Sequence, residues 1–309
     1  MPTKTKIEWC DYISNPLKAI FTAEPNELSS GCKVVKIGHV CEKISEGCAN
    51  CWASTFNVRL GTGLEYTVPN MSKVEPVMDE QELERLRTFK PKGPFKNGRS
   101  RALVFPCDMT DLFGDWVSTD QLKRIFAVFA ERKDLDFMVL TKRPAAMLAF
   151  LAGSVPLQNV ILGVSIENQV RAWDRIGSMS ELSFRGWKTG VSYEPALAPV
   201  NWGKWNFLDW VICGGESGTA SRLMAPVWAR SARDFCLISG IPFFFKQWGE
   251  WAPVKDISLI VVEQTRFRSK PVRFGDDVMV KVGKGLAGHL LDGIEWRQVP
   301  GETFGIVMP

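Results

Sequence analysis

The sequence has no apolar run long enough to cross a lipid bilayer. Its longest apolar stretches, such as residues 145–155, fall well short of the ~20 residues that a membrane-spanning helix needs. The first nine residues are polar and have no apolar segment typical of a signal peptide. Eight cysteines in 309 residues are too few for a disulfide scaffold. We therefore expect a cytoplasmic protein without a membrane partner, in which clustered cysteines hold a metal or perform redox chemistry.

An excess of one charge is also absent. Lys and Arg total 38, Asp and Glu total 34, and the formal net charge is +4. This balance permits an anionic partner without demanding one. With 45% hydrophobic and 23% charged residues, the composition is typical of a globular enzyme and excludes disordered, collagen-like and coiled-coil chains.

From residue 102 onward, short apolar runs alternate with helical patterns. The runs predict buried strands at residues 102–106, 137–140, 160–166, 189–193, 210–213 and 242–245. The helical patterns cover residues 121–132, 143–151, 169–179 and 227–239. Ser118 is placed to cap the first of these helices, and Gly240 to end the last. This alternation predicts βα units around a parallel sheet.

Polar and charged residues follow each predicted strand. They are Cys107-Asp108, Thr141-Lys142-Arg143, Glu167-Asn168, Glu194, Gly214-Gly215-Glu216 and Lys246-Gln247. In a (βα) barrel such positions all face one mouth, where catalytic residues gather. The first strand-to-helix turn, after residue 106, lacks the G-x-G-x-x-G run of a dinucleotide-binding fold. We therefore predict a barrel-like α/β fold.

The two ends of the chain differ from this pattern. The first hundred residues contain five of the eight cysteines and little sustained periodicity. The tail has alternating apolar runs at residues 259–262 and 278–282. We expect a barrel domain over residues 1–255, which includes the cysteine loop 41–51, and a small β-rich extension over residues 256–309 that packs on the barrel.

The spacing Cys41-x6-Cys48-x2-Cys51 is the most informative motif. Several thiolates on one short loop can bind zinc or an iron–sulfur cluster. A structural zinc site needs four ligands, and zinc would have to recruit Cys32 or His39 at an awkward spacing. Three thiolates on a cubane cluster leave one iron open, which suits catalysis. Buried cysteines without a metal are the third alternative.

Cys41-Glu-Lys-Ile-Ser-Glu-Gly-Cys48-Ala-Asn-Cys51-Trp52 resembles the three-cysteine motif of a phage-associated family in the radical S-adenosylmethionine superfamily. The resemblance covers nearly the whole chain in ordered blocks. They are Thr5-Lys-Ile-Glu-Trp9, Arg59-Leu-Gly-Thr-Gly-Leu64, Met109-Thr-Asp-Leu-Phe113, Val139-Leu-Thr-Lys-Arg-Pro144, Leu162-Gly-Val-Ser-Ile-Glu167, Ser192-Tyr-Glu-Pro195, Val211-Ile-Cys-Gly-Gly-Glu-Ser217, Phe244-Phe-Lys-Gln-Trp-Gly249 and Ala287-Gly-His-Leu-Leu-Asp-Gly293.

This resemblance implies a partial TIM-type barrel. It also implies a 4Fe-4S cluster bound by Cys41, Cys48 and Cys51, S-adenosylmethionine on the open iron, and an external electron donor such as a flavodoxin-like protein or a chemical reductant. The sequence departs from the superfamily pattern in two ways. The first gap has six residues where three are usual, and the aromatic residue, Trp52, follows the last cysteine instead of preceding it. The Gly-Gly-Glu sequence, which resembles the superfamily's aminoacyl-binding motif, comes unusually late in the chain.

Several residues at the strand ends are candidates for the cofactor and the reaction. For cofactor binding we expect Trp52 beside the adenine, Ser165 at the ribose, the acidic Asp108, Glu167 and Glu216, and the neighbouring Gly214 and Gly215. Each carboxylate has an alternative role in an ion pair with Lys142, Arg143 or Lys246. Lys142 is a catalytic candidate, and Lys142 or Arg143 is also a candidate to hold a carboxylate or phosphate. Tyr193 is a candidate to transfer a proton or hydrogen atom, with packing as its alternative role.

A basic run without any acidic residue consists of Arg85, Arg87, Lys90, Lys92, Lys96, Arg99 and Arg101. It is either a DNA or nucleotide contact or a solvated loop. The leading hypothesis is a radical enzyme, with rearrangement of an amino-acid-like substituent on a hypermodified thymine of phage DNA as its best substrate guess. The enzyme would then act in the host cytoplasm. The alternative is a zinc-stabilised nucleic-acid-binding protein without catalysis.

Overall fold

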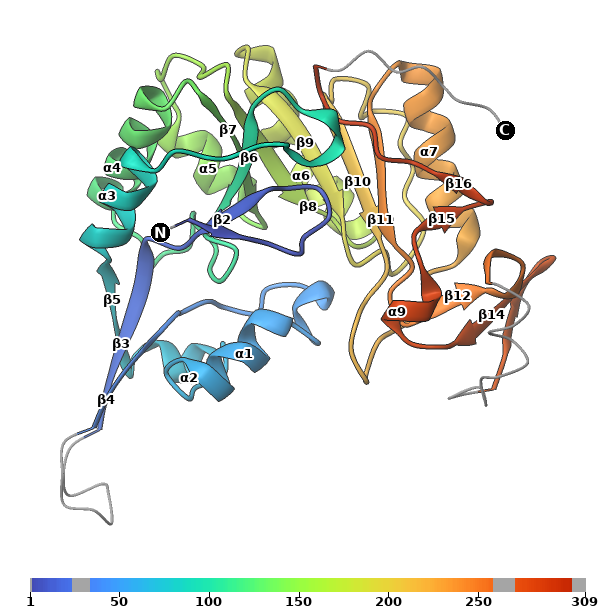
Figure 1. Cartoon of the computed structure of the whole chain (residues 1–309), viewed down its shortest axis with the longest axis horizontal. Helices are drawn as coiled ribbons and strands as arrows, with labels where there is room; N and C mark the ends of the chain where they lie inside the picture. Colours follow the sequence, from blue (N-terminus) through green and yellow to red (C-terminus); the bar gives the residue numbers. More distant parts are fainter. Residues whose placement is uncertain (1, 24–33, 258–269, 302–309) are drawn as a thin grey trace. The chain divides into compact units, whose positions relative to one another are not determined.

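The main sheet contains eight strands. In spatial order they are β1 (Thr3–Lys4), β2 (Tyr12–Ser14), β6 (Ala102–Pro106), β7 (Leu135–Thr141), β8 (Val160–Ser165), β9 (Lys188–Tyr193), β10 (Trp210–Gly214) and β11 (Phe243–Gln247) (Figure 1). The computed structural model describes residues 2–23, 34–257 and 270–301. Strands β2, β6 and β7 pair in parallel, as do β9, β10 and β11, whereas β1 is antiparallel to β2.

The six predicted strands correspond to β6 through β11, and their ends differ by at most two residues from the prediction. Strands β6 to β11 neighbour one another in chain order, which is the order of strands in a (βα) barrel. Within the described ranges, β1 and β11 are the two edges, so the sheet is open. The mixed α/β class is confirmed, and the strand order is consistent with a partial barrel.

The helices that follow these strands are also those expected. They are α4 (Thr119–Glu131), α5 (Pro144–Phe150), α6 (Gln169–Phe184) and α7 (Pro226–Ser239). The Ser118 hydroxyl accepts a hydrogen bond from the Gln121 backbone N–H, and the Gln121 side-chain oxygen accepts one from the Ser118 backbone N–H. Helix α4 therefore begins with a full capping box. Gly240 ends α7 in the left-handed region, as predicted. No helix in the described ranges has the length and apolar character needed to span a membrane.

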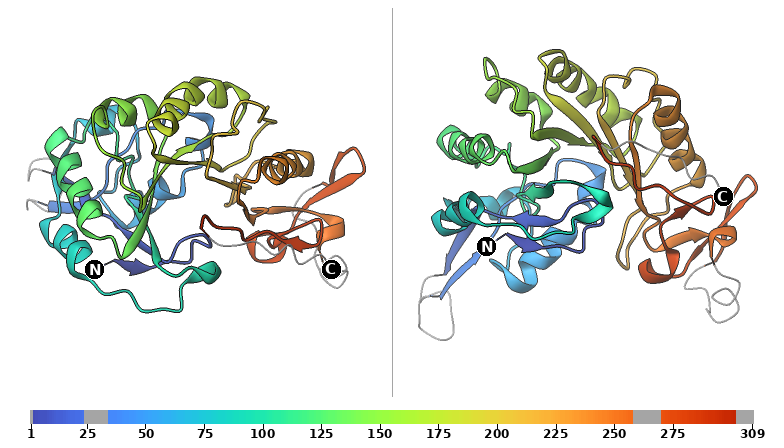
Figure 2. Two further views of the ribbon diagram at one scale, coloured as in Figure 1. Left: turned by 90° about the horizontal axis from the view of Figure 1, so that it is seen from above. Right: turned by 45° about the horizontal axis from the view of Figure 1, so that its top comes forward.

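The chain divides into two units. The N-terminal unit comprises Met1–Phe95 and Arg101–Leu162, and the C-terminal unit comprises Lys96–Ser100 and Gly163–Pro309. In the first, α4 packs on β7 through Phe129 and Phe137, whose ring centroids are 4.3 Å apart. In the second, α7 lies along β10 and β11 (Figures 1 and 2). This division falls within β8, whereas the expected boundary after residue 255 stays a prediction.

The N-terminal unit has a second sheet that the sequence did not reveal. Strand β3 (Leu17–Ala23) pairs antiparallel with both β4 (Val34–Gly38) and β5 (Val74–Met78). Short elements fill the rest of this region. They are the 3-10 helix η2 (Glu46–Cys48) and the helices α1 (Trp52–Leu60), α2 (Val68–Met71) and α3 (Glu80–Thr88). The 3-10 helix η3 (Lys96–Gly98) belongs to the C-terminal unit. The sheet matters for function because β4 leads directly into the cysteine loop.

The C-terminal tail forms small antiparallel sheets. Strands β12 (Trp251–Pro253), β14 (Asp277–Lys281) and β13 (Val272–Phe274) form one, and β15 (Leu290–Leu291) with β16 (Ile294–Glu295) forms another. The 3-10 helix η4 (Val254–Asp256) follows β12, and the four-residue α9 (Lys284–Ala287) lies between β14 and β15. The predicted run 278–282 corresponds to β14, and the run 259–262 lies outside the described residues. Residues 283–288 match G-x-G-x-x-G, but they follow an antiparallel strand and open only a four-residue helix, unlike a dinucleotide site.

Candidate functional site

The three cysteines of the motif lie on one loop of the N-terminal unit, and all are half-buried. Cys48 ends the 3-10 helix η2, and Cys51 is the residue that caps the start of α1. Backbone hydrogen bonds from Cys48 N to Ser45 O (3.0 Å) and from Cys51 N to Cys48 O (3.3 Å) wind this part of the loop tightly. The positive end of the α1 dipole therefore lies where thiolates would carry negative charge, which stabilises them.

The first and last cysteines share one apolar support. Cys41 and Cys51 both pack against a buried group formed by Ala53, Tyr66 and Met109. The Tyr66 hydroxyl donates a 2.7 Å hydrogen bond to the Met109 carbonyl, which joins the cysteine loop region to the segment after β6. Burial raises the pKa of the Cys41 thiol to about 12, and the charges of Asp111 and Cys51 act in the same direction. The two sulfurs are thus close enough to influence each other.

Asn57 anchors the entry of the cysteine loop to α1. Its buried side chain accepts from the His39 N–H (2.8 Å) and donates to the Thr62 hydroxyl and the Leu64 carbonyl (both 2.8 Å). A Cβ on Gly38 would lie 2.4 Å from the Asn57 Oδ1, so only glycine permits this approach. The His39 ring contacts the Leu17 carbonyl, and burial lowers its pKa to about 4.

A small pocket opens beside Cys41. His39, Asn57, Thr62, Tyr66 and Asn70 are among its lining residues, and its volume of about 10 Å³ is room for one water molecule. His39 is one of the two residues considered above as the fourth ligand of a zinc site, and it lines the same pocket as Cys41. Cys32, the other, lies outside the described residues. In the described part of the chain, no three His, Cys, Asp or Glu side chains converge on one metal-ion position.

Asp108 and Lys142, two predicted site residues, lie in the same unit as the cysteines. Asp108 accepts a hydrogen bond from the Asn15 amide, yet burial keeps its pKa above the usual range. Burial raises the pKa of Tyr66, and the charges of Cys41, Cys51 and Asp108 add to this effect. Lys142 is half-buried, and its backbone N–H donates to the Asp111 carboxylate at 3.0 Å. Trp52 begins α1 next to Cys51 and is 57% exposed, so its ring is available for stacking.

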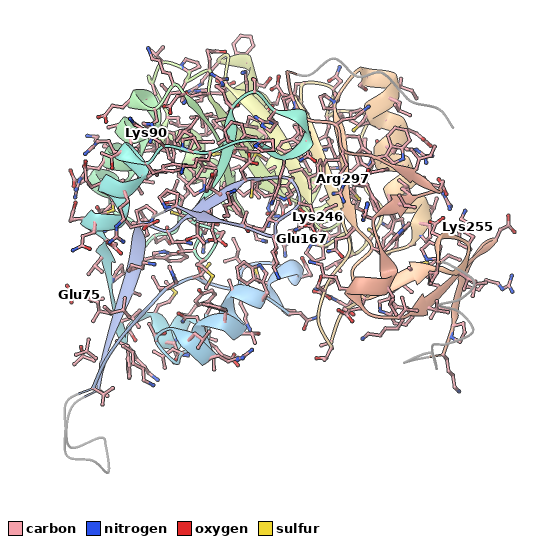
Figure 3. The ribbon with its side chains drawn as sticks, viewed as in Figure 1. Glu75, Lys90, Glu167, Lys246, Lys255 and Arg297 are labelled. Atoms are coloured by element: carbon pink, nitrogen blue, oxygen red, sulfur yellow. The ribbon has the colours of Figure 1, made fainter. Side chains whose placement is uncertain are left out.

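The remaining candidates belong to the C-terminal unit, where most have structural partners. Glu167 is fully buried (0% exposed) and forms a 2.9 Å ion pair with Arg175 of α6 (Figure 3). The same guanidinium donates to the carbonyl of Ser165. The buried Tyr193 hydroxyl donates to the Ala198 carbonyl, and burial raises its pKa. The contact of Glu167 agrees with its alternative role in an ion pair, although Arg175 was not among the predicted partners. The contact of Tyr193 agrees with its alternative role in packing.

The Gly214-Gly215-Glu216 sequence has a packing role. A Cβ on Gly215 would lie 2.0 Å from the Trp248 carbonyl, so the backbones after β10 and β11 approach too closely for any side chain. A Cβ on Gly214 would lie 2.8 Å from Glu194, whose carboxylate forms an ion pair with Lys246 at 3.0 Å. The Glu216 carboxylate binds the Arg222 guanidinium, and the Arg222 Nε–H donates to Glu216 Oε2 at 2.9 Å. An aminoacyl-binding role for this sequence stays a prediction.

Sequence reasoning missed Glu42, Asn57, Tyr66 and Asp111 as residues of the site. Two of them have partners far away in the chain: Glu42 pairs with Arg143, and Tyr66 with Met109. Asp111 and Arg143 do lie within blocks that carry the family resemblance. The blocks therefore mark the region, but only the folded chain shows which side chains meet.

No curated protein matches the sequence. Among solved structures, a doubly substituted mutant of spore photoproduct lyase with bound AdoMet and dinucleoside spore photoproduct is 11% identical, with a TM-score of 0.43. The similarity covers 91% of this chain and 71% of that chain, and it is too distant to carry an argument here. The sequence matches one family over residues 4–300, and the chain therefore belongs to the family described as "Protein of unknown function (DUF5131)".

Proposed function

We propose that this chain is a radical S-adenosylmethionine enzyme in which Cys41, Cys48 and Cys51 bind a 4Fe-4S cluster. The observation that carries the proposal is the three-thiol loop, which spans eleven residues and ends at the N-terminus of α1. Two of its thiols pack against one buried apolar group. Thiolates are the ligands that iron–sulfur clusters take in proteins, so the donor set fits the cluster.

The thiolates of a 4Fe-4S cluster are arranged differently in space from the ligands of a single metal ion. Each thiolate binds a different iron, so the sulfurs need not converge on one point. A zinc site would instead require tetrahedral convergence of four ligands.

When reduced by an external one-electron donor, such a cluster supplies the electron that cleaves the sulfonium of S-adenosylmethionine into methionine and a 5′-deoxyadenosyl radical, which takes a hydrogen atom from the substrate. The chain's own residues bind, orient and exclude water. Cys41 and Cys51 lie against Ala53, Tyr66 and Met109, which keep one side of the loop dry. In the N-terminal unit, we assign the exposed ring of Trp52 to stacking with the adenine and Asp108 to a polar contact with the cofactor.

The candidates of the C-terminal unit take supporting roles in this proposal. Glu167 is already paired with Arg175, and Tyr193 with a carbonyl. Ser165 is buried and stays a candidate for a ribose contact. Glu216 and its two glycines fix the backbone between β10 and β11.

For the substrate, we propose a carbon without an acidic proton in a modified nucleic-acid base, with isomerisation of an amino-acid-like substituent on thymine as the specific reaction. The basic run supports this in part. Arg87 binds Glu84 and Glu131, and Arg101 binds Asp136, so these two cations are already neutralised. Lys90, which is labelled in Figure 3, and Lys92 are exposed and remain the strongest candidates for phosphate contacts.

Replacing Lys90, Lys92 and Lys96 with alanine is expected to weaken binding of duplex DNA and to flatten its salt dependence. Each lost phosphate contact should lower the slope of log K against log salt by ~0.9. The measurement is a binding titration at several salt concentrations. The matched control replaces the exposed Lys73, Lys123 and Lys204, which removes the same charge elsewhere. If both triple variants lose affinity equally, the basic run is not a DNA contact.

The direct test of the proposed function is anaerobic reconstitution with iron and sulfide. We expect a brown protein with about four irons per chain. After reduction, it should release 5′-deoxyadenosine from S-adenosylmethionine, and duplex DNA containing the substrate base should increase that release. Cys48→Ala is the control for adventitious iron. A colourless protein with one zinc per chain, inert toward S-adenosylmethionine, would support the nucleic-acid-binding alternative instead.

A further inference from the structure

The two residues that flank the first cysteine are held by groups outside the cysteine loop. The Thr110 hydroxyl donates to the carbonyl of Val40. Burial raises the pKa of the Cys41 thiol, and the charge of Asp111 acts in the same direction. Arg143, which follows β7, binds the Glu42 carboxylate at 2.7 Å. The segment from Val40 to Glu42 is therefore fixed on both sides of the cysteine.

Arg143 connects these holding groups to one another. Its guanidinium contacts Glu42 and also lies 3.2 Å from the Asp111 carboxylate, while its side chain is only 13% exposed. It stacks 4.9 Å from the centroid of the Trp116 ring. The Trp116 indole N–H in turn donates to the Thr110 hydroxyl at 3.1 Å. A planar guanidinium can bind two carboxylates and a ring at once, which a lysine ammonium cannot.

Asp111 is itself rigidly placed. Its carboxylate accepts hydrogen bonds from the Thr141 hydroxyl at 2.6 Å and from the backbone N–H groups of Lys142 and Phe113 at 3.0 Å. It is 8% exposed. These donors fill its acceptor capacity, so the carboxylate is held beside Arg143.

We propose that Arg143 is a positioning residue for the cluster ligand Cys41, acting through Glu42 and Asp111. The inference rests on the proposed function. The gap between Cys41 and Cys48 contains six residues, which leaves that part of the loop long, and the Arg143–Glu42 ion pair ties down its first residue. A buried charge near a cluster ligand helps to set the reduction potential, so Arg143 also influences the potential by keeping Asp111 in place.

Replacing Arg143 with glutamine tests this role in the reconstituted protein. Loss of such supporting partners typically costs ~10–100-fold in metal affinity, and we expect iron loss to a chelator to accelerate to that extent. The midpoint potential of the cluster should shift as well. Arg143→Lys should fall between glutamine and wild type, because it keeps one ion pair but loses the bridge. If Arg143→Gln does not fold, Glu42→Gln breaks the same bridge from the loop side.

Arg132→Gln is the matched control. Arg132 is a buried arginine of the same unit that donates to the carbonyls of Leu86 and Phe89 and stacks on Phe89, away from the cysteine loop. The Arg132→Gln substitution should lower the melting temperature without changing iron retention or the midpoint potential of the cluster. If Arg143→Gln behaves in the same way as this control, Arg143 has only a general structural role and the inference is wrong.

A second measurement separates this inference from the proposed function. In the iron-free protein, alkylation of Cys41, followed by mass spectrometry with Cys48 as the internal reference, should be faster in Arg143→Gln than in wild type. If wild type takes up no iron but this acceleration is seen, the radical mechanism fails while the positioning role holds. An unchanged alkylation ratio in Arg143→Gln would overturn the positioning role.

Discussion

Each of the changes Cys41→Ala, Cys48→Ala and Cys51→Ala is expected to remove nearly all iron from the reconstituted protein and to abolish cleavage of S-adenosylmethionine. The loop offers these three thiols within eleven residues, and losing one leaves too few thiolates to retain the cluster. Iron analysis and detection of 5′-deoxyadenosine measure the two effects separately.

Cys32→Ala and Cys236→Ala provide the controls. Cys236 is buried on α7 in the C-terminal unit, and its loss should leave iron and cleavage unchanged. Cys32→Ala should also keep both, since three thiolates suffice for a cluster with one open iron. Iron loss in Cys32→Ala equal to that in Cys48→Ala would instead identify a fourth ligand. The open iron, and with it the radical mechanism, would then be excluded.

The second large effect is expected at the buried ion pair of the C-terminal unit. Glu167→Ala should lower the free energy of unfolding by ~3–5 kcal/mol, because it leaves the Arg175 charge buried without its carboxylate. Both side chains are at least 95% buried, and the pair distance is 2.9 Å. Denaturant unfolding of the iron-free protein measures the change without interference from a cofactor.

A double variant, Glu167→Leu with Arg175→Met, is the informative control. Replacing both charges by apolar side chains of similar size should restore most of the lost stability. If it does, the pair is structural. If Glu167→Gln instead folds normally but binds S-adenosylmethionine weakly, the predicted cofactor role of Glu167 is supported, and the structural interpretation of Glu167 is wrong.

Most of the main sheet was predictable because parallel strands buried on both faces are continuous apolar runs. Residues 102–106 and 189–193 illustrate this, and the helices between such runs carry recognisable ends, such as Ser118 and Gly240. The sheet of β3, β4 and β5 was not predicted. Strand β4 has an exposed middle and β5 contains Pro76, so neither gives a clear two-residue apolar period.

The candidate site was predictable only where spacing determines chemistry. The cysteines could be proposed from their spacing, whereas the partners of the acidic strand-end residues could not. Glu167 and Glu216 pair with Arg175 and Arg222, neither of which was expected, while Lys246 pairs with Glu194. Such pairs depend on where a helix or loop returns to the sheet. That information lies in the packing of the whole unit and not in the local sequence.

The most direct measurement is electron paramagnetic resonance of the reconstituted, reduced protein with and without S-adenosylmethionine. We expect the signal of a reduced 4Fe-4S cluster that changes when S-adenosylmethionine is added, because the cofactor would bind the iron that Cys41, Cys48 and Cys51 leave open. The signal should be missing in Cys48→Ala. A cluster signal that S-adenosylmethionine leaves unchanged, or a protein that binds one zinc and no iron, would contradict the account.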